Sequence, residues 1–188
     1  MQRGRAAAVL AVVIGLSVAA IDPMQVKTVP AGTRLDVMLK GMLDSGKVLV
    51  DHRFEATLLE KVESQGQVVL ASGVVVRGFI SSVRPSSKAS PQGQFTLSFD
   101  GLQIGEATVR LRATVQAIFD PKQADQLSRL GSAPAVGART DHSMMALDSV
   151  FVNEGGTVVS TNGKDAVLPV GTVLRIRLDQ PLEVPATR

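Results

Sequence analysis

The chain of 188 residues is long enough for one domain with a hydrophobic core. Its aromatic fraction is 3%, with no Trp or Tyr, so the core must be aliphatic. The same composition argues against binding sites in which exposed aromatic rings stack on sugars or bases. The lack of cysteine excludes disulfides, thiolate metal sites and a cysteine nucleophile. The net charge is +3, and removal of residues 1–20, which hold Arg3, Arg5 and no acid, leaves 18 basic and 17 acidic side chains, so the charge does not favour a nucleic acid partner.

The N-terminus has the features of a signal peptide. A basic head precedes an apolar and small-residue run over residues 6–20, and Val18 and Ala20 stand where a signal peptidase reads, unless cleavage shifts by one residue. The rival interpretation is a retained membrane anchor, but the run has 15 residues and a spanning helix needs about 20. The sequence therefore predicts a signal peptide over residues 1–20 and a short linker over 21–28, and either interpretation exports the rest of the chain.

Residues 29–119 alternate apolar and polar side chains, which is typical of strands with one buried face. Turn signals such as Asp44-Ser45-Gly46 and Asp100-Gly101 separate the runs. The pattern predicts a mainly all-β fold, a small β-barrel or sandwich with one short helix. The residues expected to face inward are Leu35, Val37, Leu39, Phe54, Ala56, Leu58, Phe95, Leu97, Phe99, Leu174, Ile176 and Leu178.

The longest alternating run covers residues 107–119 and predicts a single strand in a curved, twisted sheet. Residues 120–131 predict a short helix, since Asp120 can cap it and Pro121 suits its first position. Residues 132–165 are expected to be a linker with a short ordered segment at 143–152 that fits a helix or a strand equally well. Residues 166–188 are expected to supply a last strand that closes the barrel.

One short segment occurs twice. Residues 29–43 read VPAGTRLDVMLKGML and residues 168–182 read LPVGTVLRIRLDQPL. Proline fixes φ and cannot donate to a ladder, while glycine permits a tight bend, so each copy predicts a turn that begins a strand. A degenerate third copy places Gly73 at the glycine position. The shared residues are Pro30/Pro169, Gly32/Gly171, Thr33/Thr172, Leu35/Leu174, Leu39/Leu178 and Leu43/Leu182.

The order of these motifs over residues 29–115 resembles the β-barrel domain of the TrbI-like scaffold proteins of conjugation and type IV secretion outer-membrane complexes. In that family a P-x-G-T motif opens the domain, a second P-x-G precedes a V-x-G strand, and a Gly-Gln loop leads into a further strand. Ala71 stands here where the family's second motif has proline. The matching positions are Pro30, Gly32, Thr33, Gly73, Val76, Gly78, Gly93, Gln94, Leu102, Gly105 and Leu111.

The resemblance implies a non-catalytic cell-envelope scaffold, periplasmic or associated with the outer membrane, that assembles with itself or with other envelope proteins close to a membrane. The alternative is a monomeric periplasmic or secreted module that binds a small ligand or a surface polymer. No cofactor and no nucleic acid partner is expected in either case.

Sites for chemistry are few. Asp44 lies in the D-S-G pattern of aspartic peptidases, whose paired carboxylates activate water, although this pattern is far commoner at hairpin tips. His52 and His142 are the only histidines, and each follows an aspartate. Two histidines are too few ligands to predict a metal site. A hydrolase built on Asp44 is thus the third and remotest hypothesis.

Outward-facing arginines form the candidate interaction face, provided that the repeat strands and the long strand are neighbours. A solvated sheet surface explains these arginines equally well. Apolar residues at outward positions, namely Met38, Leu59, Phe79 and Ile118, offer an alternative contact surface. The arginines are Arg34, Arg110, Arg112, Arg175 and Arg177.

Overall fold

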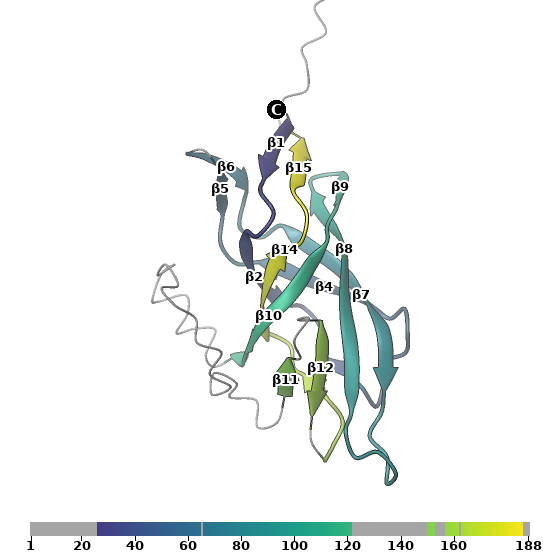
Figure 1. The fold of residues 1–188 in the computed structure, drawn as a ribbon. Helices are drawn as coiled ribbons and strands as arrows, with labels where there is room; N and C mark the ends of the chain where they lie inside the picture. Colours follow the sequence, from purple (N-terminus) through teal and green to yellow (C-terminus); the bar gives the residue numbers. More distant parts are fainter. Residues whose placement is uncertain (1–25, 65, 122–149, 153–156, 162, 186–188) are drawn as a thin grey trace, which may run out of the picture.

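The computed structural model describes residues 26–64, 66–121, 150–152, 157–161 and 163–185. These residues fold almost entirely as β-structure (Figure 1), as the alternation predicts. Apart from Asp120 and Pro121, the helix predicted over 120–131 lies outside the described residues, as do the signal peptide of residues 1–20 and the linker up to residue 25. The strands are β1 (Val26–Val29), β2 (Arg34–Leu39), β3 (Leu43–Asp44), β4 (Arg53–Leu58), β5 (Val62–Ser64), β6 (Gln67–Leu70), β7 (Val75–Arg84), β8 (Gln94–Ile104), β9 (Ala107–Arg110), β10 (Ala113–Phe119), β11 (Val150–Val152), β12 (Val158–Thr161), β13 (Val167–Leu168), β14 (Val173–Leu178) and β15 (Leu182–Pro185).

One antiparallel sheet dominates the structure. Its strands follow the order β10-β14-β2-β4-β7-β8-β12-β11, and β9 pairs with β8 beside this path. The sheet curls into a half-barrel, so that β10 at one end comes close to β8 and β11 near the other (Figure 1). Strand β14, from the C-terminal part of the chain, lies between β10 and β2. Within residues 29–119, β2 is the first strand of this sheet and β10 is the last.

The inner side of the curl holds the core, and the residues expected to face inward in β2, β4, β8 and β14 are buried there. Because Trp and Tyr are absent, Val, Leu and Ile fill most of this space. Phe54 and Phe99 meet edge to face at 5.6 Å between ring centroids. Gly78 makes room for them, because a Cβ atom there would come within 2.4 Å of Phe54 Cζ.

The single strand predicted over residues 107–119 is wrong. The chain forms β9 and β10, which pair with different neighbours, and it leaves the edge of β8 for β14 at Leu111 and Arg112. A bulge between Val115 and Ala117 then changes the alternation, because one extra residue flips the side chains that follow it. Ile118 is therefore buried at 1% exposure and does not face outward as predicted.

The stretch expected to be mainly linker contributes strands. β11 covers the last three residues of the ambiguous segment and is extended, and β12 pairs with β8. Side by side at one end of the molecule lie the small sheets β5-β6 and β1-β15, together with β9 (Figure 1). In the part of the chain that the structure describes, no helix is long and apolar enough to cross a membrane.

Candidate interaction site

The first Pro-x-Gly-Thr segment forms a tight turn. Gly32 has a φ angle of 83°, a region that glycine enters without steric cost. The Thr33 hydroxyl donates to the Pro30 carbonyl over 2.7 Å, and the Gly32 N–H donates to the Leu178 carbonyl over 2.7 Å. The turn thus bonds to the end of β14.

The second segment repeats this arrangement. Gly171 has a φ angle of 84°, and the Thr172 hydroxyl donates to the Pro169 carbonyl over 2.7 Å. The Gly171 N–H donates to the Leu39 carbonyl at the end of β2 over 3.0 Å. The first turn is therefore bonded to β14, which follows the second turn, and the second turn is bonded to β2, which follows the first. These bonds join residues near the two ends of the described chain.

A third turn shares the backbone bonds of the first two but lacks the threonine hydroxyl bond, because Val74 stands at the threonine position. Gly73 has a φ angle of 86°, its N–H donates to the Leu58 carbonyl over 2.7 Å, and the Leu58 N–H donates to the Val74 carbonyl over 2.9 Å. Ala71 occupies the proline position here. The glycine, and not the proline, is therefore common to all three turns.

Asp36 and Arg175 lie opposite each other in β2 and β14. Two guanidinium nitrogens of Arg175 donate to the two carboxylate oxygens of Asp36, each over 2.8 Å. The hydrogen bonds that Arg175 donates to Asp36 are the main reason that the pKa of Arg175 is raised. The same guanidinium lies 5.1 Å from the centroid of the Phe119 ring. Arg175 is thus fully engaged within the chain and offers little to a partner.

Around this ion pair the outer side of the sheet carries a small apolar cluster. Phe119 and Val173 are buried, and Met38, Leu59 and Ala117 pack against them. Two of the residues predicted to form an alternative contact surface, Met38 and Leu59, are therefore partly covered. A third, Phe79, lies 5.4 Å beneath the guanidinium of Arg53.

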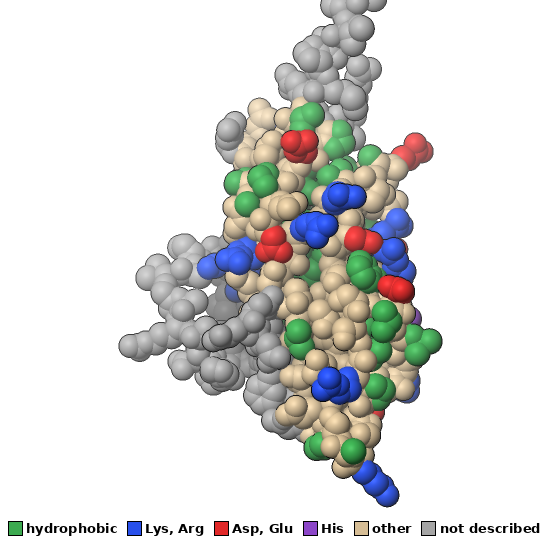
Figure 2. Space-filling model, turned by 45° about the vertical axis from the view of Figure 1, so that its right-hand side comes forward, with side chains coloured by type: hydrophobic (Ala, Val, Ile, Leu, Met, Phe, Trp, Pro, Cys, Tyr) green, Lys and Arg blue, Asp and Glu red, His purple; other side chains and the backbone are tan. Residues whose placement is uncertain are grey.

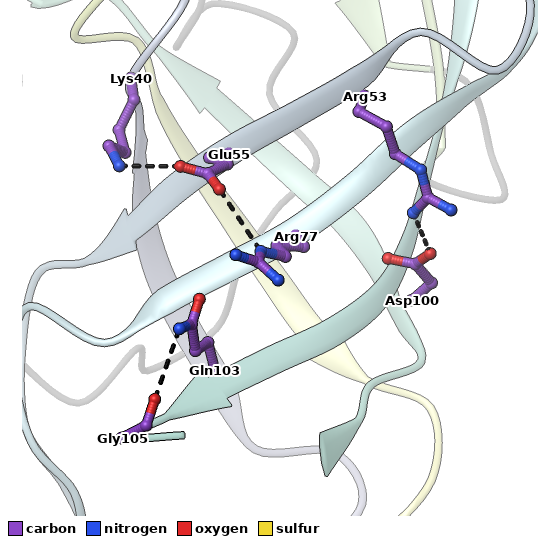
Figure 3. Close-up of polar contacts among 7 residues, drawn as sticks. All are labelled: Lys40, Arg53, Glu55, Arg77, Asp100, Gln103 and Gly105. Carbon is purple, nitrogen blue, oxygen red and sulfur yellow. Dashed lines mark hydrogen bonds and ion pairs between the residues drawn. The ribbon is translucent and has the colours of Figure 1, made fainter. Parts of the chain in front are cut away.

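Paired charges cover the outer side of β4, β7 and β8 (Figure 3). Lys40 Nζ lies 2.8 Å from Glu55, and Arg77 Nε lies 3.4 Å from the other carboxylate oxygen of Glu55. The hydrogen bond from Lys40 is the main reason that the pKa of Glu55 is lowered. Arg53 pairs with Asp100 on the same side. In this part of the surface, the three basic side chains and the two carboxylates are therefore all paired with one another.

The predicted arginine face is only partly assembled. Arg34 and Arg177 lie directly opposite each other in β2 and β14, and both are exposed. Arg110 and Arg112 lie at the junction of β9 and β10, and among the described residues none of these four arginines forms an ion pair. Like charges placed opposite each other destabilise a strand pair. On the face shown in Figure 2, basic and acidic side chains are interspersed.

Arg110 and Arg112 line a groove of about 300 Å³ formed by residues 109–112 and 180–183. Val109 and Pro181 contribute apolar surface to this groove, Leu111 and Leu182 are buried beneath it, and Glu183 is the acidic residue of the lining. Sequence reasoning identified the two arginines but missed residues 180–183. The sequence Asp179-Gln180-Pro181 is typical of a turn, but no feature of the sequence predicts that this turn lies beside β9.

The D-S-G segment joins loops that are distant in sequence. Ser45 is buried, its hydroxyl accepts the Ala166 N–H over 2.9 Å, and it donates to Asp165 over 3.1 Å. The Asp44 carboxylate accepts the Gly46 N–H over 3.0 Å. These bonds describe a turn that is locked against the loop before β13.

Of the two histidines, the structure describes only His52. His52 follows Asp51 in an exposed turn where Asp51 has a φ angle of 66°, and His142 lies outside the described residues. Among the residues whose positions are described, no three His, Cys, Asp or Glu side chains are grouped as metal ligands.

No family model and no curated protein matches the chain. Among solved structures, ComB10 of the Com type IV secretion system of Helicobacter pylori superposes with a TM-score of 0.45 at 11% identity, over 86% of this chain and 92% of that chain. A likeness of this size does not carry the function of that protein over to this one.

Proposed function

We propose that the protein is an exported, non-catalytic scaffold of the cell envelope, built on a TrbI-like β domain. The observation that carries this proposal is the curled sheet in which three Gly turns recur and the first and last repeat strands, β2 and β14, pair. Such a sheet leaves its outer side and strand edges available to other chains, which suits an assembling component.

The positions of the motif residues support the proposal. Gly32, Gly73 and Gly171 begin strands with one hydrogen-bonding scheme, and Gly78 accommodates the aromatic pair of the core. Gly93 is also placed where only glycine fits, since a Cβ atom there would lie 2.5 Å from Asp165 Cα. The motif therefore consists of positions that shape the domain, in line with a structural role. Export and an envelope location rest on the composition of residues 1–20.

The decisive experiment measures assembly of residues 21–188 after expression with the leader. Size-exclusion chromatography with light scattering should show oligomers, or pull-down from envelope extracts should recover defined envelope proteins. A protein that stays monomeric and recovers none would refute the scaffold proposal. Replacement of Arg34 and Arg177 by Glu should weaken assembly if the arginine face takes part, whereas replacement of ion-paired Lys40 by Glu serves as the charge control.

The groove at residues 109–112 and 180–183 favours one second candidate, a monomeric binding module. A ligand for that module would raise the melting temperature of the monomer. A hydrolase built on Asp44 is the third candidate, and unchanged activity of Asp44→Ala in any assay that detects hydrolysis would remove it.

A further inference from the structure

Arg34 and Arg177 stand directly opposite each other in β2 and β14. Their neighbours Leu35 and Ile176 are buried in the core, so alternation turns both arginines to the outer side of the sheet. Side chains in such opposite positions have Cβ atoms about 4.5–5.5 Å apart, and like charges there destabilise the strand pair. Both arginines are exposed, and neither forms an ion pair within the described part of the chain. The two guanidinium groups are therefore close together and open to solvent.

The fold does not require arginine at these two positions. The two copies of the repeat are offset by 139 positions. At the other end of the same two strands, the corresponding pair is Met38 and Val173. These side chains are apolar, and Phe119 and Leu59 pack with them on the outer side of the sheet. The same backbone arrangement thus gains apolar contacts at one end, whereas at the other end it carries two like charges that no described carboxylate pairs.

The position between these two ends shows how a carboxylate binds on this surface. Asp36 lies opposite Arg175 and accepts two hydrogen bonds from its guanidinium, each of 2.8 Å. A guanidinium presents a planar pair of donors that matches a carboxylate in this bidentate way, which a lysine ammonium does not. A carboxylate from another chain can bind Arg34 or Arg177 with the same geometry.

The surroundings of the arginine pair favour a short acidic segment over a polyanion. Asp36 lies two residues beyond Arg34, and Asp179 lies two residues beyond Arg177, so a carboxylate borders each arginine on the same side of its strand. The Asp179 carboxylate accepts the Thr114 hydroxyl over 2.9 Å. Anionic lipid surfaces attract clusters of about four to eight basic side chains. Two arginines bordered by two carboxylates match instead one or two carboxylates of a polypeptide.

We propose that an acidic segment of a different envelope protein binds to the outer side of β2 and β14, with its carboxylates on Arg34 and Arg177. This inference rests on the proposed scaffold function and assigns one of its docking sites. The competing explanation is that solvent alone surrounds both side chains.

The probe is a blocked synthetic peptide in which Asp and Ser alternate, titrated into isotope-labelled protein that begins at residue 21 and followed by NMR. Alternate side chains of an extended peptide are about 6.6 Å apart, which suits two arginines in facing positions. A control peptide replaces Asp by Asn. We expect the Asp peptide to bind at least about tenfold more tightly, the factor expected for one charged hydrogen bond. The largest shifts should occur at the side-chain N–H signals of Arg34 and Arg177, and binding should weaken as salt is raised.

Three double variants separate binding from folding. Arg34→Val with Arg177→Met copies the apolar end of the two strands, so it should resist urea at least as well as wild type and yet lose the binding. Arg34→Lys with Arg177→Lys keeps both charges but removes the planar donors, so binding should weaken about tenfold. Arg84→Gln with Lys88→Gln removes two exposed charges elsewhere and should leave the binding unchanged.

Equal binding of the Asp and Asn peptides would overturn the inference, as would shifts centred away from Arg34 and Arg177 or full binding by the double Lys variant. A marked loss of resistance to urea in Arg34→Val with Arg177→Met would show that the arginines hold the strands together, and this result would also reject it. Competition by free glutarate at the peptide's own affinity would identify a small-anion site instead. Binding of phosphatidylglycerol vesicles that needs both arginines would identify a lipid surface instead.

Light scattering without peptide tests the scaffold proposal separately. Oligomers that bind no peptide would reject this inference alone. Peptide binding by a monomer that recovers no envelope protein would reject the scaffold proposal alone. Self-association that is lost in the double Lys variant would identify a second copy as the occupant and reject the partner named here.

Discussion

Asp36 and Arg175 stand opposite each other across β2 and β14, and each is the central residue of its own copy of the repeated segment. They are separated by 139 positions, which is also the offset between the two copies. The two copies pair in antiparallel orientation, so a local pseudo-two-fold axis at this ion pair relates one copy to the other. The mutual bonds of Gly32 and Gly171 obey the same relation.

A double-mutant cycle should show that this central pair couples strongly. Asp36→Ala and Arg175→Ala are expected to give a coupling energy of about 1–3 kcal/mol, because the contact is bidentate and charged. The side chains are 22% and 31% exposed, so solvent screens them only in part. Urea unfolding followed by circular dichroism measures the free energies.

The Lys40–Glu55 pair supplies the matched control. Its side chains are 48% and 41% exposed, and its coupling should not exceed about 1 kcal/mol. Equal coupling in the two cycles would contradict a special role for the central pair.

The repeated turns predict that Gly32→Ala and Gly171→Ala each destabilise the protein. A left-handed backbone costs a residue with a Cβ atom about 1–2 kcal/mol, and both glycines have φ angles above 80°. Gly41→Ala is the control, because Gly41 is exposed, lacks a positive φ and has open space around its Cβ position. Thermal and urea unfolding should rank the variants, and a loss at Gly41 as large as at Gly32 would count against the turn explanation.

Gly78→Ala should overpack the core. Its Cβ atom would lie 2.4 Å from both Phe54 Cζ and the Ser98 carbonyl oxygen, so neighbouring groups must move. We expect a loss of about 1–3 kcal/mol in the free energy of unfolding, together with shifted ring signals of Phe54 in NMR spectra. In Gly101→Ala in β8, the nearest atom to the new Cβ would be the methyl carbon of Thr108, at 3.2 Å, so this variant should cost less. The reverse order would disprove this account.

Asp165 should make the free energy of unfolding depend on pH. Its carboxylate accepts the Ser86 N–H over 2.6 Å, and this bond is the main reason that the pKa of Asp165 is lowered. A lowered pKa in the folded state means that the stabilisation is present at neutral pH and is lost as the pH falls below about 4, through the folded-state pKa.

Asp165→Asn should therefore destabilise the protein at pH 7, and the difference from wild type should shrink toward pH 2. Urea unfolding across this range gives the comparison. A difference that stays constant with pH would show that the charge of Asp165 is not what holds the Ser86 loop.

The sequence alone determined the features that depend on local chemistry. Alternation identified the buried residues of β2, β4 and β14, because side chains in a strand point to opposite faces with a period of two. The glycines at positions 32, 73 and 171 marked turns, because few other residues tolerate a positive φ. The sequence set the adjacency of the two repeat strands only as a condition of the arginine face, and the structure pairs these strands.

Only the tertiary structure decided which edges meet. The break at Leu111 and Arg112 arises because one stretch of chain serves two partners, β8 and β14, and the bulge after Val115 reverses the facing of Ile118. The groove likewise exists only because residues 109–112 and 180–183 come together from distant parts of the chain. Such contacts depend on strand order and register across the whole sheet, which local alternation and turn chemistry do not encode.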